Sequence, residues 1–167
     1  GTTPPSITNA GFEDGITGWT DLDGVSTTIY RTGAKSGKET LAGTGTEEFY
    51  QNLTWNALYK GRSFTLTAYA QTSNAACAIK IGIDDGITTT YSSTTNTTSW
   101  VQLTVTKTLA ANATRIRIIG NGPQSANEYI GYWDDFSISL AALTLGATST
   151  LAEFNGKLYA TSDKSLL

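Results

Sequence analysis

Apolar and polar side chains alternate along most of the chain. In residues 62–72, every second side chain from Phe64 to Ala70 is apolar, and the side chains between them are polar. The same period of two recurs in residues 79–83, 101–105 and 130–140. Side chains of a β-strand face one side of a sheet at this period, and turn-forming sequences such as Asp85-Gly86 separate the runs. The pattern predicts about nine short strands and almost no helix, which is typical of an all-β protein built as an antiparallel β-sandwich.

The pattern changes after residue 140. Residues 151–160 contain two short apolar runs on either side of Asn155-Gly156, which predicts a hairpin. This stretch resembles a strand pair of a β-propeller blade. We therefore expect residues 1–143 to form the sandwich and residues 144–167 to be a linker and the start of a following, propeller-like domain. Because the chain begins with Gly1 rather than Met, we expect a fragment of a longer protein.

Composition removes several kinds of chemistry. The chain has no histidine and one cysteine, which excludes a Ser-His-Asp triad, a His-ligated zinc and an internal disulfide. The formal net charge is -3, so nucleic acid is not an expected partner. No window of the sequence is long and apolar enough for insertion into a membrane.

Adjacent acidic residues include the pairs Glu47-Glu48, Asp84-Asp85 and Asp134-Asp135. Glycoside hydrolysis needs two carboxylates on either side of one bond. Adjacent residues of a strand face opposite sides of the sheet, so none of these pairs meets that requirement. We predict that the chain is not an enzyme.

Six short motifs appear in a consistent order between residues 7 and 140. They are Asn9-Ala10-Gly11-Phe12-Glu13 with Gly18-Trp19, Ser36-Gly37-Lys38, Tyr50-Gln51-Asn52-Leu53, Gly61-Arg62-Ser63-Phe64-Thr65-Leu66, Trp100, and Trp133-Asp134-Asp135-Phe136-Ser137-Ile138. Together they resemble the jelly-roll carbohydrate-binding modules of families 4, 9, 16 and 22. The resemblance implies a jelly-roll sandwich that binds a polysaccharide or glycan. Trp133 and Phe136 stand where smaller aliphatic residues are usual in these modules.

The resemblance also implies a structural Ca²⁺ that joins the first and last strands. The implied ligands are the carboxylates of Glu13 and of Asp134 or Asp135, with backbone oxygens near Gly11 and Lys38. Carboxylate and carbonyl oxygens are the ligands that Ca²⁺ prefers. Unbroken alternation places Asp134 on the inward face with Phe136 and Ile138, where an unpaired carboxylate is costly. The alternative is that Asp134 accepts hydrogen bonds from backbone amides and that Glu13 belongs to a turn.

A sugar site needs aromatic platforms for the C–H face of the ring and polar groups for its hydroxyls. The candidates for carbohydrate binding are Tyr69, Gln71, Tyr91, Trp100, Gln102, Arg117 and Trp55. We expect most of them to form a row across the outer face of one sheet; a loop-borne platform of Trp55 and Tyr59 is an alternative to that row. The alternative is that some are solvated surface, and that Trp19 and Trp100 are packing residues.

These observations predict a carbohydrate-binding module that holds a linked domain near its substrate without altering the sugar. We expect a monomer joined to other domains of its parent chain, located outside the cell, at the cell surface or on a virion. The alternative is a structural or receptor-attachment domain of a viral or cell-surface protein, a role that a threonine-rich sandwich without disulfides also suits.

Overall fold

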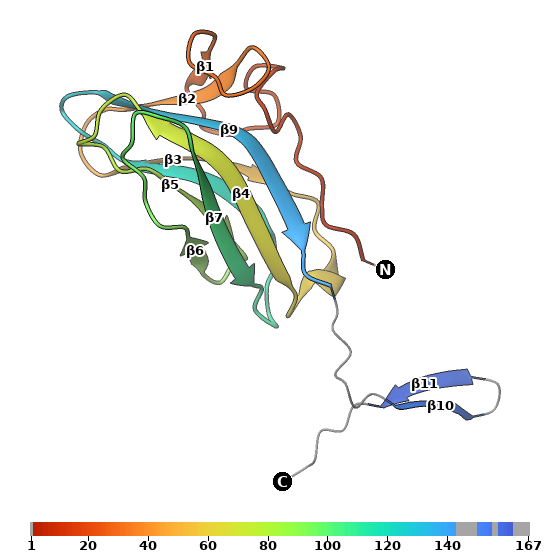
Figure 1. Ribbon diagram of the computed structural model, residues 1–167. Coiled ribbons are helices and arrows are strands. Elements are labelled where there is room, and N and C mark those ends of the chain that lie inside the picture. Colours follow the sequence, from red (N-terminus) through yellow and green to blue (C-terminus); the bar gives the residue numbers. More distant parts are fainter. Residues whose placement is uncertain (1, 143–149, 155–156, 162–167) are drawn as a thin grey trace.

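Two antiparallel sheets face each other in the computed structural model (Figure 1), which describes residues 2–142, 150–154 and 157–161. The first sheet has five strands in the spatial order β1 (Gly24–Ser26), β2 (Ser36–Leu41), β9 (Tyr129–Leu140), β4 (Ser63–Thr72) and β7 (Val101–Thr108). The second has four, in the order β3 (Thr46–Asn52), β8 (Arg117–Pro123), β5 (Lys80–Asp84) and β6 (Thr89–Tyr91). All of these pairings are antiparallel. The predicted antiparallel β-sandwich is confirmed.

The only helical element in the described residues is a single 3-10 turn, η1 (Ala57–Tyr59), between β3 and β4. None of the described helices has the length and apolar character needed to cross a membrane.

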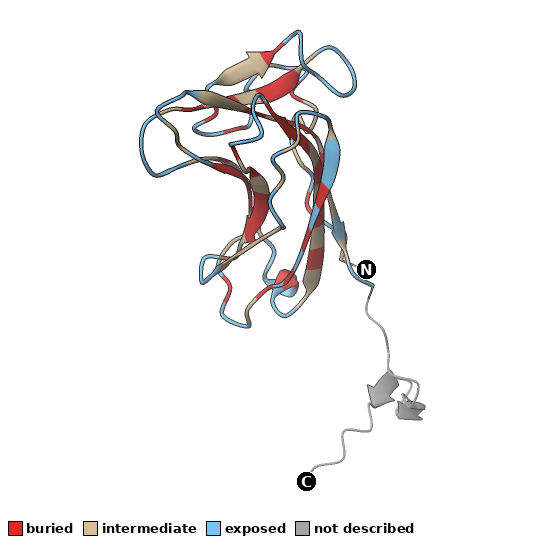
Figure 2. Cartoon of the chain, turned by 60° about the vertical axis from the view of Figure 1, so that its left-hand side comes forward, coloured by how far each residue is buried: buried red, intermediate tan, exposed pale blue. Residues whose placement is uncertain are grey.

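The apolar faces of the strands meet between the two sheets, where Figure 2 shows buried residues along both of them. The alternating side chains of β4 from Phe64 to Ala70 are completely buried, as the pattern predicted. A cluster of aromatic rings fills one end of this core, and it includes Trp19, whose ring centroid lies 5.0 Å from that of Phe12 and 4.9 Å from that of Phe136. The Trp19 indole N–H donates to the backbone oxygen of Asn9 over 3.1 Å. Trp19 is therefore a packing residue.

Strand β9 contains a bulge that corrects the sequence-based placement of Asp134. Thr67 of β4 pairs with Ser137, but Tyr69 pairs with Asp134, so the register shifts between them. Asp135 absorbs the shift with a φ of 51°, a left-handed conformation that aspartate tolerates better than most residues. The prediction that Asp134 shares the inward face of Phe136 was therefore wrong. Asp134 lies on the outer face beside Tyr69, and it is nevertheless fully buried.

The predicted C-terminal hairpin is present in the backbone. β10 (Thr150–Phe154) pairs with β11 (Lys157–Thr161), and Phe154, the last residue of β10, is the register partner of Lys157, the first residue of β11. The predicted linker from residue 144 falls mainly outside the described residues, and the division of the chain at residue 143 stays a prediction.

Candidate functional site

The predicted carbohydrate-binding residues are divided between the two sheets. Tyr69, Gln71 and Gln102 lie on the outer face of the five-stranded sheet, and Tyr69 and Gln102 are register partners. Tyr91 and Arg117 belong to β6 and β8 of the four-stranded sheet. The expected single row was therefore wrong, because β4 and β7 do not share a sheet with β5, β6 and β8.

The aromatic part of the five-stranded face is covered. The 27–35 segment, which joins β1 to β2, places the Arg31 guanidinium carbon 3.4 Å from the centroid of the Tyr69 ring. Gln71, in the same strand as Tyr69, is only 8% exposed. One side of the Tyr69 ring is therefore covered by Arg31, and that side is not open to a sugar ring.

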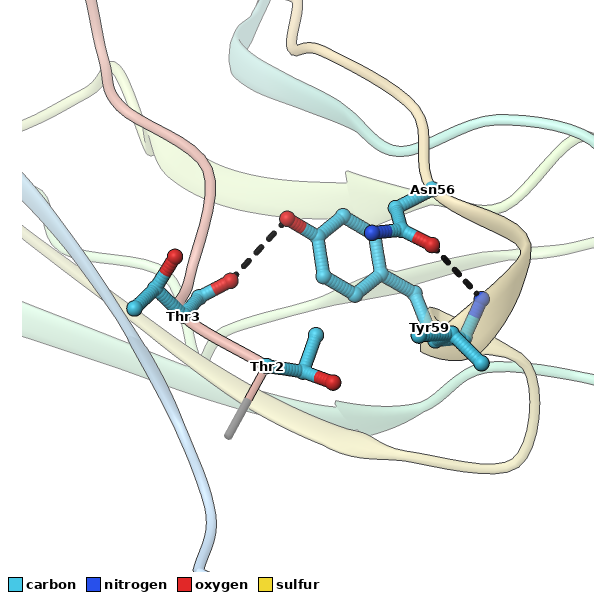
Figure 3. Close-up of a pocket in the computed structure, with 5 residues that line it drawn as sticks. Thr2, Thr3, Asn56 and Tyr59 are labelled. Carbon is cyan, nitrogen blue, oxygen red and sulfur yellow. Dashed lines mark hydrogen bonds between the residues drawn. The ribbon is translucent and has the colours of Figure 1, made fainter.

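The two tryptophans among the predicted binding residues lie beside strands rather than in them. Trp100 immediately precedes β7 and is half-buried, while Trp55 packs against the core beside Tyr59, with ring centroids 6.1 Å apart. Figure 3 shows a depression beside η1, lined by Thr2, Thr3, Asn56, Leu58 and Tyr59. Tyr59 is buried there, and its hydroxyl donates to the backbone oxygen of Thr3 over 3.0 Å. The Tyr59 hydroxyl thus holds the N-terminal segment, and the buried Tyr59 ring does not form a loop-borne platform for a sugar.

The outer face of the four-stranded sheet carries side chains in three cross-strand rows, which follow from the pairing registers. The central row is Tyr50, Ile119, Gly82 and Tyr91. The row on one side is Glu48, Asn121 and Lys80, and the row on the other is Asn52, Arg117, Asp84 and Thr89. We call this surface the Tyr50–Tyr91 face. It has aromatic ends, an apolar and glycine centre, and polar margins.

Gly82 allows Tyr91 to lie across the middle of this face. A Cβ atom at Gly82 would meet Cδ1 of Tyr91 at 2.7 Å, closer than real side chains approach. The Tyr91 hydroxyl donates to Oε2 of Glu48 over 3.1 Å, and the side-chain amide of Asn121 donates to the same oxygen over 3.3 Å. Burial, together with the Glu48 carboxylate, raises the pKa of Tyr91 to about 12. The ring is therefore fixed in place as a neutral phenol.

Arg117 and Lys80 place cations against the two aromatic rings. The guanidinium carbon of Arg117 lies 3.8 Å from the Tyr50 ring centroid, and the Lys80 ammonium lies 4.1 Å from that of Tyr91. Nε of Arg117 donates to Oδ1 of Asn52 over 2.8 Å. These contacts fix the orientation of the flanking polar groups before any ligand arrives.

Asp84 forms the charged corner of the face. Its carboxylate pairs with Nε of Arg115 at 2.6 Å and accepts from the Gly86 amide and the Thr89 hydroxyl. Burial alone raises the pKa of Asp84, but these hydrogen bonds outweigh burial and hold the pKa below its ordinary value. Asp84 is therefore an ionised, fully engaged group.

Glu48, Tyr50 and Asn121 were not among the predicted binding residues. Tyr50 alternates with the buried Phe49 and Gln51, which is a local signal for an outward position. Nothing in the sequence pairs it with Ile119, because β3 and β8 lie far apart along the chain.

The residues expected to hold calcium come together only in part. Glu13 is turned toward the 27–35 segment, where its carboxylate accepts from the Ala34 and Lys35 amides, the Ala34 contact being 2.9 Å. Lys38 lies within β2, paired with both β1 and β9. In the described part of the chain, no group of three or more His, Cys, Asp or Glu side chains is placed to hold a metal ion.

Asp134 and Asp135 do converge, on Gly11. A Cβ atom at Gly11 would lie 3.7 Å from an oxygen of each carboxylate. Asp134 accepts from the amides of Arg31 and Thr32, and Asp135 pairs with the Arg31 guanidinium at 2.7 Å. Burial raises the pKa of Asp134, the two amides lower it in part, and the net shift is upward. Two carboxylates beside the Gly11 backbone fit a cation, but Arg31 and the loop amides already satisfy them.

Comparison with known proteins adds the family. Residues 5–127 match the model of the CBM4/9 family, whose description is "Carbohydrate binding domain". The chain is 32% identical over 136 residues to a keratan-sulfate endo-1,4-beta-galactosidase of Sphingobacterium multivorum, an alignment that covers 79% of this chain and 30% of that enzyme. The chain thus spans less than a third of the length of this curated relative.

Solved structures confirm the jelly-roll fold. A family 61 carbohydrate-binding module in complex with β-1,4-galactotriose has a TM-score of 0.62 at 18% identity, covering 81% of this chain and 97% of that one. A cyclase from Fischerella sp. has a TM-score of 0.65 at 17% identity, covering 84% and 96%. Carbohydrate-binding modules of families 4, 16 and 22 match as well. The chain is therefore a carbohydrate-binding domain with a jelly-roll fold, and it belongs to the CBM4/9 family.

Proposed function

We propose that the chain binds its glycan on the Tyr50–Tyr91 face and leaves the sugar unaltered. The observation that carries the proposal is the central row, in which two tyrosines flank Ile119 and Gly82. Cα atoms at the ends of this row are separated by three interstrand spacings, about 14 Å. An extended oligosaccharide along the row can stack its C–H faces on the half-buried rings of Tyr50 and Tyr91, while its hydroxyls meet Glu48 and Asn52 at the margins.

The charge state of the face supports binding over hydrolysis. A glycosidase needs one carboxyl group with a raised pKa to protonate the leaving group. Asp84 has a lowered pKa and is held by Arg115, and Glu48 is engaged by Tyr91 and Asn121. We therefore propose that the domain is not catalytic.

Two of the similar proteins direct the choice of ligand. One relative acts on keratan sulfate as an endo-1,4-beta-galactosidase, and one structural neighbour was solved with β-1,4-galactotriose. We infer that a glycan chain containing β-linked galactose is the ligand class. We further propose that the domain, monomeric and outside the cell, holds a linked catalytic domain near this glycan by raising its local concentration.

The binding proposal is tested by calorimetry with β-1,4-galacto-oligosaccharides and a panel of other glycans. Tyr50→Ala and Tyr91→Ala should each weaken binding at least about tenfold, a loss of ~1.4 kcal/mol. Tyr30→Ala is the matched control, because Tyr30 is 42% exposed in the 27–35 segment and lies outside the Tyr50–Tyr91 face. Circular dichroism verifies that each variant is folded. Wild-type affinity in both tyrosine variants would rule out this face.

Calcium is a separate proposal. We propose that Ca²⁺ binds beside Gly11, held by Asp134 and Asp135 in place of the Arg31 guanidinium that pairs with Asp135, and that it would supply positive charge between the first and last segments of the sandwich. A cation bound only to the folded state raises the melting temperature. Melting is therefore compared in excess calcium and in chelator, for the wild type and for Asp135→Asn. An identical midpoint in both solutions for the wild type contradicts the proposal.

A further inference from the structure

Arg117 is an arginine without an ionic partner. Arg31 pairs with Asp135 and Arg115 pairs with Asp84. Within the described residues, no carboxylate lies within 4.0 Å of the Arg117 guanidinium.

The contacts of Arg117 leave the outer edge of its guanidinium available. Its Nε donates to Asn52, and its plane stacks on Tyr50. Neither terminal nitrogen has an acceptor among the described side chains and backbone groups. A guanidinium held by its inner edge and by stacking presents its two terminal NH₂ groups in the geometry that binds a planar or tetrahedral oxyanion.

Lys80, on the other side of the central row, is likewise a cation that stacks on a tyrosine ring. Its ammonium lies over the Tyr91 ring, with no ion pair or side-chain hydrogen bond among the described residues. Lys80 belongs to the row of Glu48 and Asn121, whereas Arg117 belongs to the opposite row. The two cations therefore lean over the central row from its two margins.

The charges around this face leave a positive excess on an acidic chain. Asp84 is neutralised by Arg115, and Glu48 accepts from two neutral donors. Glu48 keeps its own negative charge, so the face carries Arg117 and Lys80 against one carboxylate, a net charge of about +1, on a chain whose net charge is -3. An anionic substituent would pair with these cations where they lie over the rings, an interaction that a neutral sugar lacks.

We propose that the Tyr50–Tyr91 face selects glycans that carry an anionic substituent, either a sulfate ester or a uronate carboxylate. Arg117 binds the oxyanion through its terminal nitrogens, and Lys80 contributes a second positive charge across the row. This inference rests on the proposed function, because it assigns the substrate class of the same face.

The test uses three oligosaccharides of equal length: neutral β-1,4-galactan, a sulfated galactan, and an oligogalacturonide. Calorimetry at low salt should show that the wild-type domain binds at least one anionic ligand about tenfold more tightly than the neutral one. Arg117→Gln should remove that preference, and added salt should remove it from the wild type. Lys60→Gln, which neutralises an exposed lysine outside the face, is the matched control and should keep the preference.

Each outcome is decisive. Preference for the sulfated ligand alone identifies the sulfate ester, and preference for the oligogalacturonide alone identifies the uronate. Equal or tighter binding of the neutral galactan overturns this inference and leaves the proposed function intact. Absence of binding to all three ligands and to the wider glycan panel overturns both.

Discussion

Asp85→Asn should destabilise the sandwich strongly, because Asp85 joins its two sheets. Asp85 follows β5 in the four-stranded sheet and is 1% exposed. Its carboxylate accepts from the Ile87, Thr88 and Ala110 amides over 3.0, 2.8 and 3.0 Å. The same carboxylate lies 3.4 Å from the ammonium of Lys107, a buried residue of β7 at the edge of the five-stranded sheet. The connection is thus a buried ion pair supported by three amides.

The size of the effect follows from that burial. Asparagine removes the charge opposite Lys107 and places an NH₂ donor where an acceptor is required. Breaking one partner of a buried ion pair costs about 3–5 kcal/mol. The titration of Asp85 gives a second figure: burial raises its pKa, but the three amides and Lys107 outweigh burial and lower the pKa from 3.8 to about 2. A shift of that size corresponds to about 2 kcal/mol, slightly below the first range.

Thermal unfolding followed by circular dichroism at pH 7 measures the change. At roughly 2–4 °C per kcal/mol for a chain of this size, Asp85→Asn should lower the melting temperature by about 6–20 °C. Asp21→Asn is the control, since Asp21 is exposed and should change stability by less than about 0.5 kcal/mol. Asp85→Asn with Lys107→Met should be more stable than Asp85→Asn alone, because no charge is then left buried. A single variant within about 1 kcal/mol of the wild type would refute the reasoning.

Three further predictions concern pH and the binding face. The Asp85 carboxylate has a lowered pKa, so the stability that it contributes should be present above pH ~4 and lost as the pH falls toward ~2. Urea unfolding at a series of pH values measures this loss, which should be absent from Asp85→Asn. Glu39 is 1% exposed, and burial raises its pKa to about 7 although it accepts a hydrogen bond from the Asp23 amide. Between pH ~4.5 and ~7, Glu39 therefore ionises in the unfolded chain while it stays protonated in the folded one, so the free energy of unfolding should fall over this range. Glu39→Gln should be more stable than the wild type at pH 8. Gly82→Ala should displace the Tyr91 ring and weaken glycan binding about tenfold in calorimetry while the circular dichroism spectrum is retained; unchanged affinity would show that the ring position is unimportant.

The strands were predictable because a sandwich buries one face of each of them. The alternation in residues 62–72 corresponds to β4, and that in residues 79–83 and 101–105 lies within or beside β5 and β7. Alternation is a local property of one strand, and it gave the wrong face for Asp134 because β9 contains a bulge. The bulge at Asp135 adds a residue to one strand only, and that extra residue is visible only once the partner strand β4 is known.

The binding face was harder to predict, because its position depends on which strands share a sheet. Tyr91 and Arg117 were recognisable as outward residues, but so was Tyr69, and no local feature separates them. The structure separates them by what covers each face: Arg31, from the segment between β1 and β2, closes over Tyr69, whereas the cations over Tyr50 and Tyr91, Arg117 and Lys80, belong to the four-stranded sheet itself.

Gly82 shows a second reason why the face could not be read from the sequence. Candidate binding residues are sought among aromatic and polar side chains, yet the orientation of Tyr91 depends on a residue that has no side chain. Tyr91 reaches Glu48, 43 positions earlier in the chain, only because its ring can lie over Gly82. A neighbouring residue with a Cβ would push the ring away from the sheet and separate it from Glu48. The shape of the platform is therefore determined by a non-local contact and by a missing side chain, and neither leaves a pattern in the residues around Tyr91.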